Sequence, residues 1–483
     1  MIRTVVVGAG AAGIPLAVRL SDDPRRSVVL LEAGADGASD DAGLRDGSAL
    51  RGADPAHAAN WAHPAHLTAS RPYAVARGRG VGGSTLINGG AFTLPRASDL
   101  AAWERAGGPA WSAEALTAVI DDITRDGPVR VAPTPQSNPA SAAFLAACAE
   151  RGFPAEPDRN AGRPPGAGPV PSTFAGGERV SIDRAYLTPE ARRRLEVRGD
   201  QRALRIAFDG DRAVGVETDS GVIPADDVVL CAGALGSARL LLASGIGPAG
   251  HLDEVGVPVV ADLPVGRAFD DHPSIAIDVR TTRPVGSADE PFALPTSLRA
   301  GALPDGDLEI LLSVKPPAYL RTGAPGALQD PALQLLVTLH AARSRGTIAL
   351  RSADPREDPA IDYGYLAHAE DLGRLRAGAR LAVELLRADA FAGLVAEVDT
   401  SLIAALDDDR ALDAWIRAHL GTALHTCGSA PLGAVVDSHG CVRGVRGLRV
   451  ADTAILPRAP SRGPYAAAVV VGEHVARLLR AEP

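Results

Sequence analysis

The chain opens with short apolar runs separated by turns of small residues. Thr4–Val7 and Ser27–Leu31 are almost entirely β-branched or aliphatic, a pattern typical of parallel strands that are buried on both faces. Between them, Gly8–Gly13 leads into a small, apolar segment of helical period that runs to about Leu20. This order predicts a strand, a glycine turn, a helix and a second parallel strand.

Each glycine of the first turn is expected to have its own role. Gly8 permits the tight turn, Gly10 lets the backbone approach a pyrophosphate, and Gly13 allows close helix–strand packing. The free N–H groups at the start of the helix suit phosphate oxygens. Glu32 ends the second strand, where its carboxylate can accept from both ribose hydroxyls. Dinucleotide binding is therefore expected, without a choice between NAD and FAD; the alternative is a unit whose glycines serve only packing.

Further apolar periodicity predicts helices and strands along the rest of the chain. The expected helices are Ser112–Ile123 with Ser112 as N-cap, Ala140–Arg151, Arg184–Arg194, His368–Ala388 and Tyr465–Leu479. The expected strands are Leu195–Val197, Ala203–Phe208, Ala213–Thr218, Asp227–Cys231, Ile275–Val279, Leu308–Val314, Leu333–His340 and Gly346–Leu350. Residues 36–76 show little periodicity and are interpreted as a long loop or lid.

Composition narrows the class of protein. At 483 residues the chain predicts two or more structural units. The net charge of −9 and the lack of a basic run give no sign of a nucleic-acid partner. No apolar stretch approaches the ~20 residues of a membrane span, and the early first strand leaves no room for a signal peptide, so a cytoplasmic location is expected.

The possible metal ligands do not form a convincing cluster. The four cysteines lack CxxC or metal spacing and are expected to be free thiols. His57, His63 and His66 lie in the expected loop without a nearby acidic or cysteine cluster. They are interpreted as solvated histidines, and no metal site is predicted.

A second glycine-rich stretch, Arg77–Gly90, contains no acidic residue and reads R-G-R-G-V-G-G-S-T-L-I-N-G-G. Such a stretch is typical of backbone pressed against a ligand or of N–H donors that face anionic oxygens. The alternative is a glycine-rich surface loop, which the interspersed apolar residues disfavour.

Together these motifs resemble the glucose–methanol–choline (GMC) family of FAD-dependent oxidoreductases. The resemblance is carried, in family order, by Gly8–Gly13 with Glu32, Arg77–Gly90, Gly233–Gly247, Val265–Pro273 and residues 425–476. It implies an α/β fold: a Rossmann-type FAD-binding domain with a discontinuous substrate domain built on an antiparallel sheet (α+β). The implied boundaries are 1–94, 180–274 and 420–483 for the FAD-binding domain, and 95–179 and 275–419 for the substrate-binding or cap domain.

The resemblance also implies the site residues. Non-covalent FAD contacts are expected from Gly8, Gly10, Ala12, Gly13, Glu32, Arg79, Val81, Gly83, Ser84, Asn88, Ala203, Ala232, Gly233, Asp452, Pro464 and Tyr465. His425, in the stretch H-T-C-G-S-A-P-L-G, takes the place of the family's catalytic base. A histidine suits this role because its unperturbed pKa is about 6.5. It would take the hydroxyl proton while the carbinol carbon gives a hydride to the flavin.

Two positions depart from the family pattern. The second active-site His or Asn is replaced by Gly463, so His425 would lack its usual partner, unless Ser461, Arg462 or Cys427 substitutes. A missing cation beside the flavin disfavours reaction with oxygen, although Arg462 could restore the charge. Ile87 stands where some members carry a histidine covalently bound to FAD, so covalent attachment there is excluded.

The expected activity is that of an FAD-dependent alcohol dehydrogenase that passes electrons to a quinone or another carrier. The alternatives are an oxygen-using alcohol oxidase that makes peroxide, a hydroxynitrile-type lyase with structural FAD, and a non-catalytic flavoprotein. The H-x-C-G-S-A-P and S-R-G-P stretches are similar to the mycofactocin-associated branch, whose members reoxidise a peptide-derived redox cofactor in actinobacteria. The partner would then be a small-molecule alcohol or this reduced cofactor.

Overall fold

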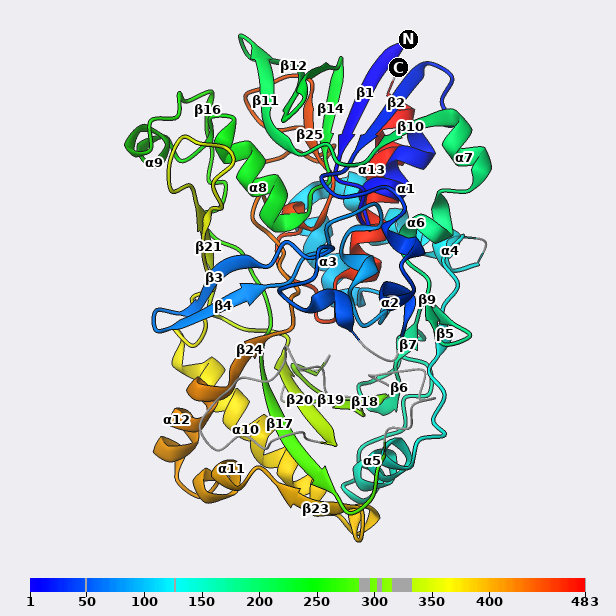
Figure 1. Cartoon of the computed structure of the whole chain (residues 1–483), viewed down its shortest axis with the longest axis vertical. Helices are drawn as coiled ribbons and strands as arrows, with labels where there is room; N and C mark the ends of the chain where they lie inside the picture. Colours follow the sequence, from blue (N-terminus) through cyan, green and yellow to red (C-terminus); the bar gives the residue numbers. More distant parts are fainter. Residues whose placement is uncertain (48–49, 126, 286–295, 302–305, 315–331, 483) are drawn as a thin grey trace.

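The molecule is elongated, with a parallel sheet towards one end and an antiparallel sheet towards the other (Figure 1). The computed structural model describes residues 1–47, 50–125, 127–285, 296–301, 306–314 and 332–482. Both termini lie at the end that holds the parallel sheet (Figure 1). None of the described helices is both long enough and apolar enough to cross a membrane.

The parallel sheet is built from the apolar runs that the sequence predicts. Its strands, in spatial order, are β10 (Leu195–Arg198), β2 (Arg26–Leu31), β1 (Ile2–Val7), β14 (Asp227–Leu230) and β25 (Leu448–Val450). Helix α1 (Gly13–Leu20) packs closely against α13 (Tyr465–Ala481), because Gly472 of α13 has no side chain: a Cβ there would lie 2.2 Å from the backbone oxygen of Ala12. The predicted α/β, Rossmann-type fold is confirmed.

A three-stranded antiparallel sheet and several helices complete this half. The sheet contains β11 (Ala203–Asp209), β12 (Arg212–Thr218) and β13 (Gly221–Pro224), and β11 packs against α8 (Gly233–Ala243). The single helix expected over Arg184–Arg194 is wrong: α6 (Ile182–Tyr186) and α7 (Pro189–Arg194) are separate. Pro189 has no N–H to continue α6, and the Thr188 hydroxyl accepts from Ala191 N at 3.2 Å, which caps a new helix.

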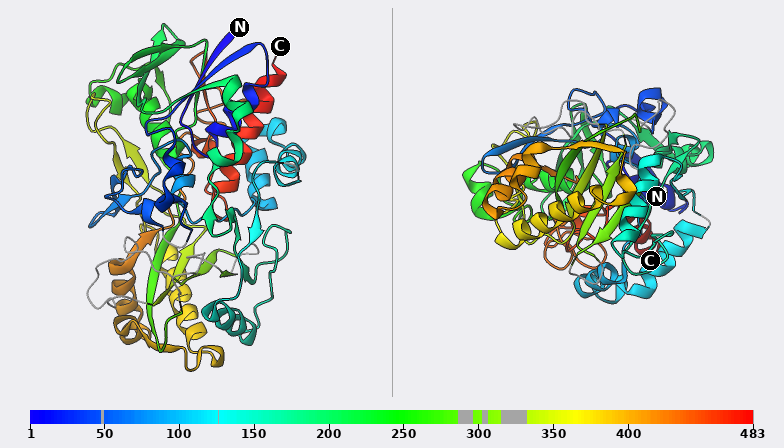
Figure 2. Two further views of the ribbon diagram at one scale, coloured as in Figure 1. Left: turned by 45° about the vertical axis from the view of Figure 1, so that its right-hand side comes forward. Right: turned by 90° about the horizontal axis from the view of Figure 1, so that it is seen from below.

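The antiparallel sheet forms the other half. Its strands, in spatial order, are β23 (Val395–Val398), β17 (Pro273–Thr281), β20 (Leu333–Leu339), β19 (Leu308–Ser313), β18 (Thr296–Ala300) and β6 (Ala167–Pro169), and β24 (Leu420–Thr422) also pairs with β17. Helix α10 (Ala369–Leu386) lies across one face of these strands, as the view from below shows (Figure 2). Parts of the strand-rich region that the sequence predicts, at 286–295, 302–305 and 315–331, lie outside the described residues.

Further helices pack around the two halves. They are α3 (Ala97–Gly107), α4 (Ala113–Arg125), α5 (Pro139–Glu150), α9 (Ala249–Glu254), α11 (Thr400–Ala405) and α12 (Asp409–His419). The Ser112 hydroxyl accepts from Ala115 N at 3.2 Å, as its predicted capping role requires. The boundaries of the two domains stay a prediction.

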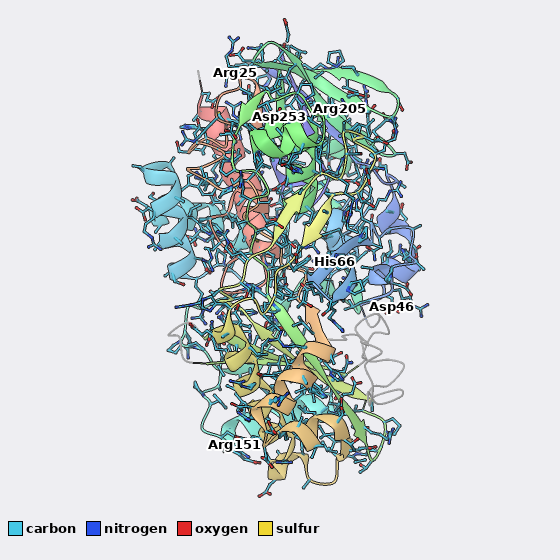
Figure 3. All side chains as sticks on the ribbon, turned by 90° about the vertical axis from the view of Figure 1, so that its left-hand side faces the viewer. Arg25, Asp46, His66, Arg151, Arg205 and Asp253 are labelled. Atoms are coloured by element: carbon cyan, nitrogen blue, oxygen red, sulfur yellow. The ribbon has the colours of Figure 1, made fainter. Side chains whose placement is uncertain are left out.

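The long loop expected over residues 36–76 is wrong in its second half. There β3 (His63–Thr68) and β4 (Arg71–Val75) form a hairpin, which joins β22 (Ala360–Asp362) and β21 (Thr347–Ala349) in a four-stranded sheet. Its strand pattern is hidden in the sequence because proline and histidine occupy exposed positions, such as that of His66 on the outer side of β3 (Figure 3). Before the hairpin, α2 covers Ala42–Arg45, and residues 48–49 lie outside the described part.

Candidate active site

A cavity of about 600 Å³ lies between the two large sheets, a volume in the range of cofactor and substrate pockets. Its walls come from the carboxyl ends of the parallel strands, the start of α13 and the inner face of the antiparallel sheet. The predicted site residues that line it are Gly8, Gly10, Ala12, Glu32, Gly83, Ser84, Asn88, Ala203, Ala232, Gly233, His425, Asp452, Pro464 and Tyr465. Gly13, Arg79 and Val81 do not line it.

These three residues have other contacts. A Cβ on Gly13 would lie 1.9 Å from the backbone oxygen of Gly8, so the glycine lets α1 begin directly against the turn. Arg79 is exposed, and its guanidinium lies 5.1 Å from the centroid of the Trp61 ring. Val81 is fully buried.

The two glycine-rich stretches meet at the cavity wall. A Cβ on Gly83 would lie 2.7 Å from Cα of Gly10, so the two backbones are in direct contact. Gly8 and Gly83 have φ angles of +105° and +54°, which favour glycine. With the start of α1 beside them, these turns present backbone rather than side chains to a ligand, which fits a pyrophosphate.

Glu32 lies at the end of β2 beside this turn. Its carboxylate accepts backbone N–H groups from Ala9 at 3.0 Å, Gly34 at 3.0 Å and Gly80 at 3.1 Å. Burial raises the pKa of Glu32, while these donors favour the ionised form. The carboxylate therefore ties both glycine-rich stretches together and also faces the cavity, where it fits the hydroxyls of a ribose.

Asp452 connects β25 to the second glycine signature. Its carboxylate accepts from Gly233 N at 2.8 Å, from the Ser237 hydroxyl at 2.6 Å and from Ala454 N at 2.7 Å. Burial raises its pKa to about 6, although the hydrogen bonds lower it. The side chain is fixed at the cavity wall, as a contact to the polar chain of a flavin cofactor requires.

His425 lies in the segment between β24 and β25, where Asp271 and His272 contact it. Its backbone N–H donates to Asp271 Oδ1 at 2.8 Å, and its Nδ1 lies 2.9 Å from Nδ1 of His272. The preceding residue, Leu424, has a φ of +64°, a costly conformation for a leucine that is typical of functional segments. Burial, together with His340, lowers the pKa of His425 to about 3, so the ring is neutral near pH 7.

Gly463 lies directly opposite His425. A Cβ at this position would be 3.3 Å from His425 Nε2, and both residues line the cavity. A larger side chain at position 463 would therefore touch His425. This is where the second His or Asn of the family pattern would lie, which glycine replaces in this chain. Nε2 of His425 consequently faces glycine backbone and open cavity.

None of the three substitutes considered from the sequence lines the cavity. Ser461 is bonded to Asp99 through its N–H at 2.9 Å and its hydroxyl at 3.0 Å. Cys427 is fully buried, and burial raises the pKa of its thiol well above the usual value. Arg462 is turned away towards Glu156.

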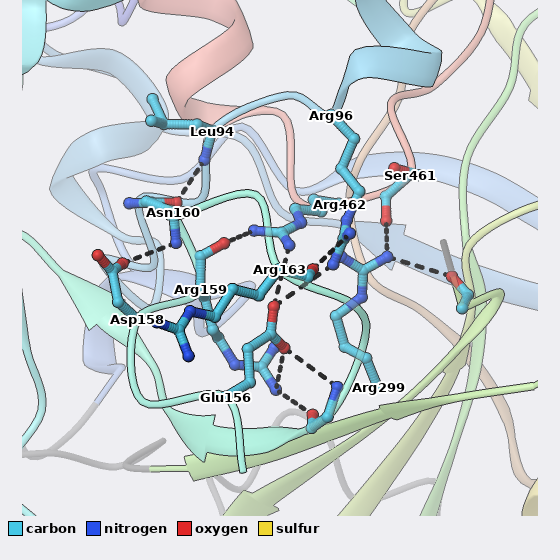
Figure 4. Close-up of polar contacts among 12 residues, drawn as sticks. Leu94, Arg96, Glu156, Asp158, Arg159, Asn160, Arg163, Arg299, Ser461 and Arg462 are labelled. Carbon is cyan, nitrogen blue, oxygen red and sulfur yellow. Dashed lines mark hydrogen bonds and ion pairs between the residues drawn. The ribbon is translucent and has the colours of Figure 1, made fainter. Parts of the chain in front are cut away.

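The Arg462 guanidinium belongs to a buried network of arginines (Figure 4). It donates to Glu156 Oε1 at 3.3 Å and to the backbone oxygen of Arg159. Arg96 donates to the same Glu156 oxygen at 3.4 Å. Burial lowers the pKa of Arg462 to about 9. The network fixes the segment that precedes α13 and so the position of Gly463.

The inner face of the antiparallel sheet carries two rows of side chains towards the cavity. The strand register aligns Ser274, Thr338 and Glu309 in a polar row. It aligns Ala276, Leu336 and Leu311 in a neighbouring apolar row. The intervening residues of these strands face α10 and the core, which is the usual alternation of a half-buried sheet.

Sequence reasoning missed several groups at this site. Glu309 Oε1 accepts from Arg159 at 3.1 Å, and its Oε2 lies 3.3 Å from His340 Nε2. Glu309 and Thr338 could have been found as polar positions inside otherwise apolar strands. His272 belongs to the D-D-H-P stretch that carries the family resemblance, but a motif position alone does not show that its ring meets His425.

Known proteins are similar to this chain over almost its whole length. Residues 3–274 and 342–472 match two family models, both described as GMC oxidoreductase. A GMC-type oxidoreductase from the thcA 5′ region of Rhodococcus erythropolis is 36% identical, over 98% of this chain and 97% of that protein. An oxygen-dependent choline dehydrogenase from Brucella ovis is 31% identical, over 97% of this chain and 94% of that protein.

The overall structure has close counterparts as well. The crystal structure of pyridoxine 4-oxidase from Mesorbium loti superimposes with a TM-score of 0.91, at 26% identity, over 100% of both chains. The matched family models cover both the glycine-rich stretches and the segment that carries His425. The chain therefore belongs to the GMC oxidoreductase family, and it is an FAD-dependent enzyme that acts on CH–OH groups.

Proposed function

We propose that the protein is an FAD-dependent alcohol dehydrogenase in which His425 accepts the hydroxyl proton of the substrate. The observation that carries this proposal is the position of His425 Nε2. It opens towards Gly463 inside the same cavity that the nucleotide-binding turn, Glu32 and Asp452 line. When bound, FAD supplies the hydride acceptor.

The chain's own residues prepare this reaction in three ways. The start of α1 and the two glycine turns bind the pyrophosphate, and Glu32 binds the ribose. Asp271 and the left-handed Leu424 hold the backbone of His425 in place. Burial keeps the His425 ring in its neutral form, with a bare nitrogen for the substrate hydroxyl, throughout the neutral pH range. The lowered pKa of about 3 differs from the value near 6.5 that the sequence suggested and makes the ring a weaker base.

The two rows of the antiparallel sheet are proposed to select the substrate. The apolar row of Ala276, Leu336 and Leu311 suits a hydrocarbon or aromatic portion. The polar row suits a group that can hydrogen-bond with Ser274 or Thr338. A small alcohol with one polar and one apolar side fits these two rows of side chains.

Electron transfer to a quinone or another carrier is proposed in preference to reaction with oxygen. An oxidase benefits from a cation beside the flavin, where negative charge develops on oxygen. Gly463 supplies no side chain, and Arg462 is bonded to Glu156 away from the cavity. The similarity to the mycofactocin-associated branch and the cytoplasmic location stay predictions from the sequence.

Anaerobic mixing of the FAD-loaded protein with alcohols tests the reaction class. Choline, pyridoxine and benzyl alcohol are suitable probes, because relatives or structural neighbours are named for substrates of these types. We expect an accepted alcohol to bleach the visible flavin bands and to yield the corresponding aldehyde. Cleavage of mandelonitrile to benzaldehyde, with the flavin bands unchanged, would instead show a lyase.

A further inference from the structure

His272 is the side chain that contacts His425 on the side away from Gly463. Their Nδ1 atoms are 2.9 Å apart, and the ring planes meet at 84° with centroids 5.1 Å apart. Asp271 holds both residues, because its Oδ1 accepts from His272 N at 2.6 Å and from His425 N at 2.8 Å. One buried carboxylate thus fixes the backbones of both residues, and their rings meet in a T-shaped arrangement.

Both rings are neutral near pH 7. Burial lowers the pKa of His272 well below its usual value, with further lowering by His340 and His425. Burial and His340 likewise lower the pKa of His425 to about 3, and Arg77 adds to this, whereas Glu309 opposes it. Two neutral rings share one proton along the Nδ1–Nδ1 line, so one ring donates and the other accepts.

The proposed role of His425 decides which ring accepts. A base that takes a proton on Nε2 has a bare Nε2 and therefore carries its ring hydrogen on Nδ1. This hydrogen lies on the 2.9 Å contact with Nδ1 of His272, so Nδ1 of His272 must be bare to accept it. The His272 ring then carries its own hydrogen on Nε2, which makes no hydrogen bond among the described residues.

We propose that His272 is a positioning residue: its Nδ1 accepts the Nδ1–H of His425 and so holds the Nε2 lone pair of His425 towards the substrate hydroxyl. The inference rests on the proposed role of His425 as base. It also explains how the base keeps its orientation although position 463 offers no side chain. The residue that orients His425 is thus His272, on the side of the ring away from Gly463, and not a residue at position 463.

The tautomer of His425 can be measured directly in the FAD-loaded full chain. Long-range ¹H–¹⁵N correlation spectra of protein labelled with ¹⁵N-histidine distinguish a bare ring nitrogen from an N–H, and His425→Gln identifies the signals of His425. We expect the wild-type ring to carry its proton on Nδ1. In His272→Leu that proton loses its acceptor, and we expect the Nε2–H tautomer to appear. His272→Asn, which offers an amide oxygen near the Nδ1 position, should restore the Nδ1–H form.

Kinetics provide a second readout. With an alcohol that bleaches the wild-type flavin, kcat of His272→Leu should fall by roughly tenfold or more while KM changes little, because a wrong tautomer affects the proton transfer and not binding. His474→Leu is the matched control: His474 is also buried, packs against Trp111 and does not line the cavity. It should leave both the tautomer and kcat unchanged.

Two results would overturn the inference: an Nε2–H tautomer of His425 in the wild-type protein, or an unchanged tautomer in His272→Leu. If His272→Leu does not fold, the tautomer of His425 in the wild-type protein and in His272→Asn still tests the inference. Failure of the proposed function can be told apart from failure of this inference. The proposed function fails if no alcohol bleaches the flavin or if turnover survives the loss of His425, and neither result affects the measurement of the tautomer.

Discussion

Replacing His425 with alanine is expected to lower kcat by roughly 10²-fold or more while the protein keeps its FAD. The variant loses the only imidazole whose Nε2 faces Gly463 in the described part of the cavity. FAD binding should persist because the glycine turns, Glu32 and Asp452 are unchanged. Steady-state turnover of an alcohol that bleaches the wild-type flavin, together with the FAD-to-protein ratio, measures both quantities.

His439→Ala is a suitable control, because His439 is exposed and does not line the cavity. Its turnover should equal that of the wild type. The base must be neutral to act, and the lowered pKa of about 3 keeps His425 neutral as the pH falls from 8 to 6. Turnover of the wild type should therefore not titrate with a pKa near 6.5. Full activity of His425→Ala would remove the histidine from the mechanism.

Replacing Gly13 with alanine is expected to disrupt FAD binding. The added Cβ would lie 1.9 Å from the backbone oxygen of Gly8 and 2.9 Å from Cβ of Cys231. Because a backbone atom cannot rotate away, α1 must move relative to the phosphate-binding turn. We expect the Kd for FAD to rise at least about tenfold, which corresponds to ~1.4 kcal/mol. Titration of the apoprotein with FAD measures this.

Gly373→Ala is the matched control for this prediction. Gly373 lies within α10, and a Cβ there would meet only the Arg376 guanidinium, at 3.8 Å. Alanine also has the higher helix propensity. The Kd for FAD should therefore stay at its wild-type value. An equally tight Kd in Gly13→Ala would show that the close contact between α1 and the turn is not needed for cofactor binding.

The sequence was most informative where local pattern and fold coincide. The buried run Thr4–Val7 and the glycine turn after it form β1 and the start of α1 as predicted. The hairpin of β3 and β4 was missed although its own pairing is local, because proline and histidine occupy its exposed positions and hide the strand pattern. The pairing of β3 with β22 joins segments far apart in the chain, and such pairing leaves little local signal.

In the candidate site, too, the sequence predicts residues that belong to local motifs but not contacts between distant segments. Glu32 and His425 could be placed from their motifs, and both line the cavity. The contact between His272 and His425 could not, because it joins two segments that only tertiary folding brings together. The direction of the Arg462 side chain was equally hidden: sequence spacing put it beside Gly463, but buried Glu156 draws the guanidinium away.

The reoxidation of the reduced flavin tests the central claim most directly and needs no substrate. The purified protein is reduced anaerobically with dithionite, air is admitted, and the return of the flavin colour is timed; a quinone is then added. Because Gly463 supplies no cation and Arg462 is bonded to Glu156 away from the cavity, we predict that the flavin stays bleached in air for minutes and recovers its colour when the quinone is added. Return of colour within the mixing time would show an oxidase and contradict the account.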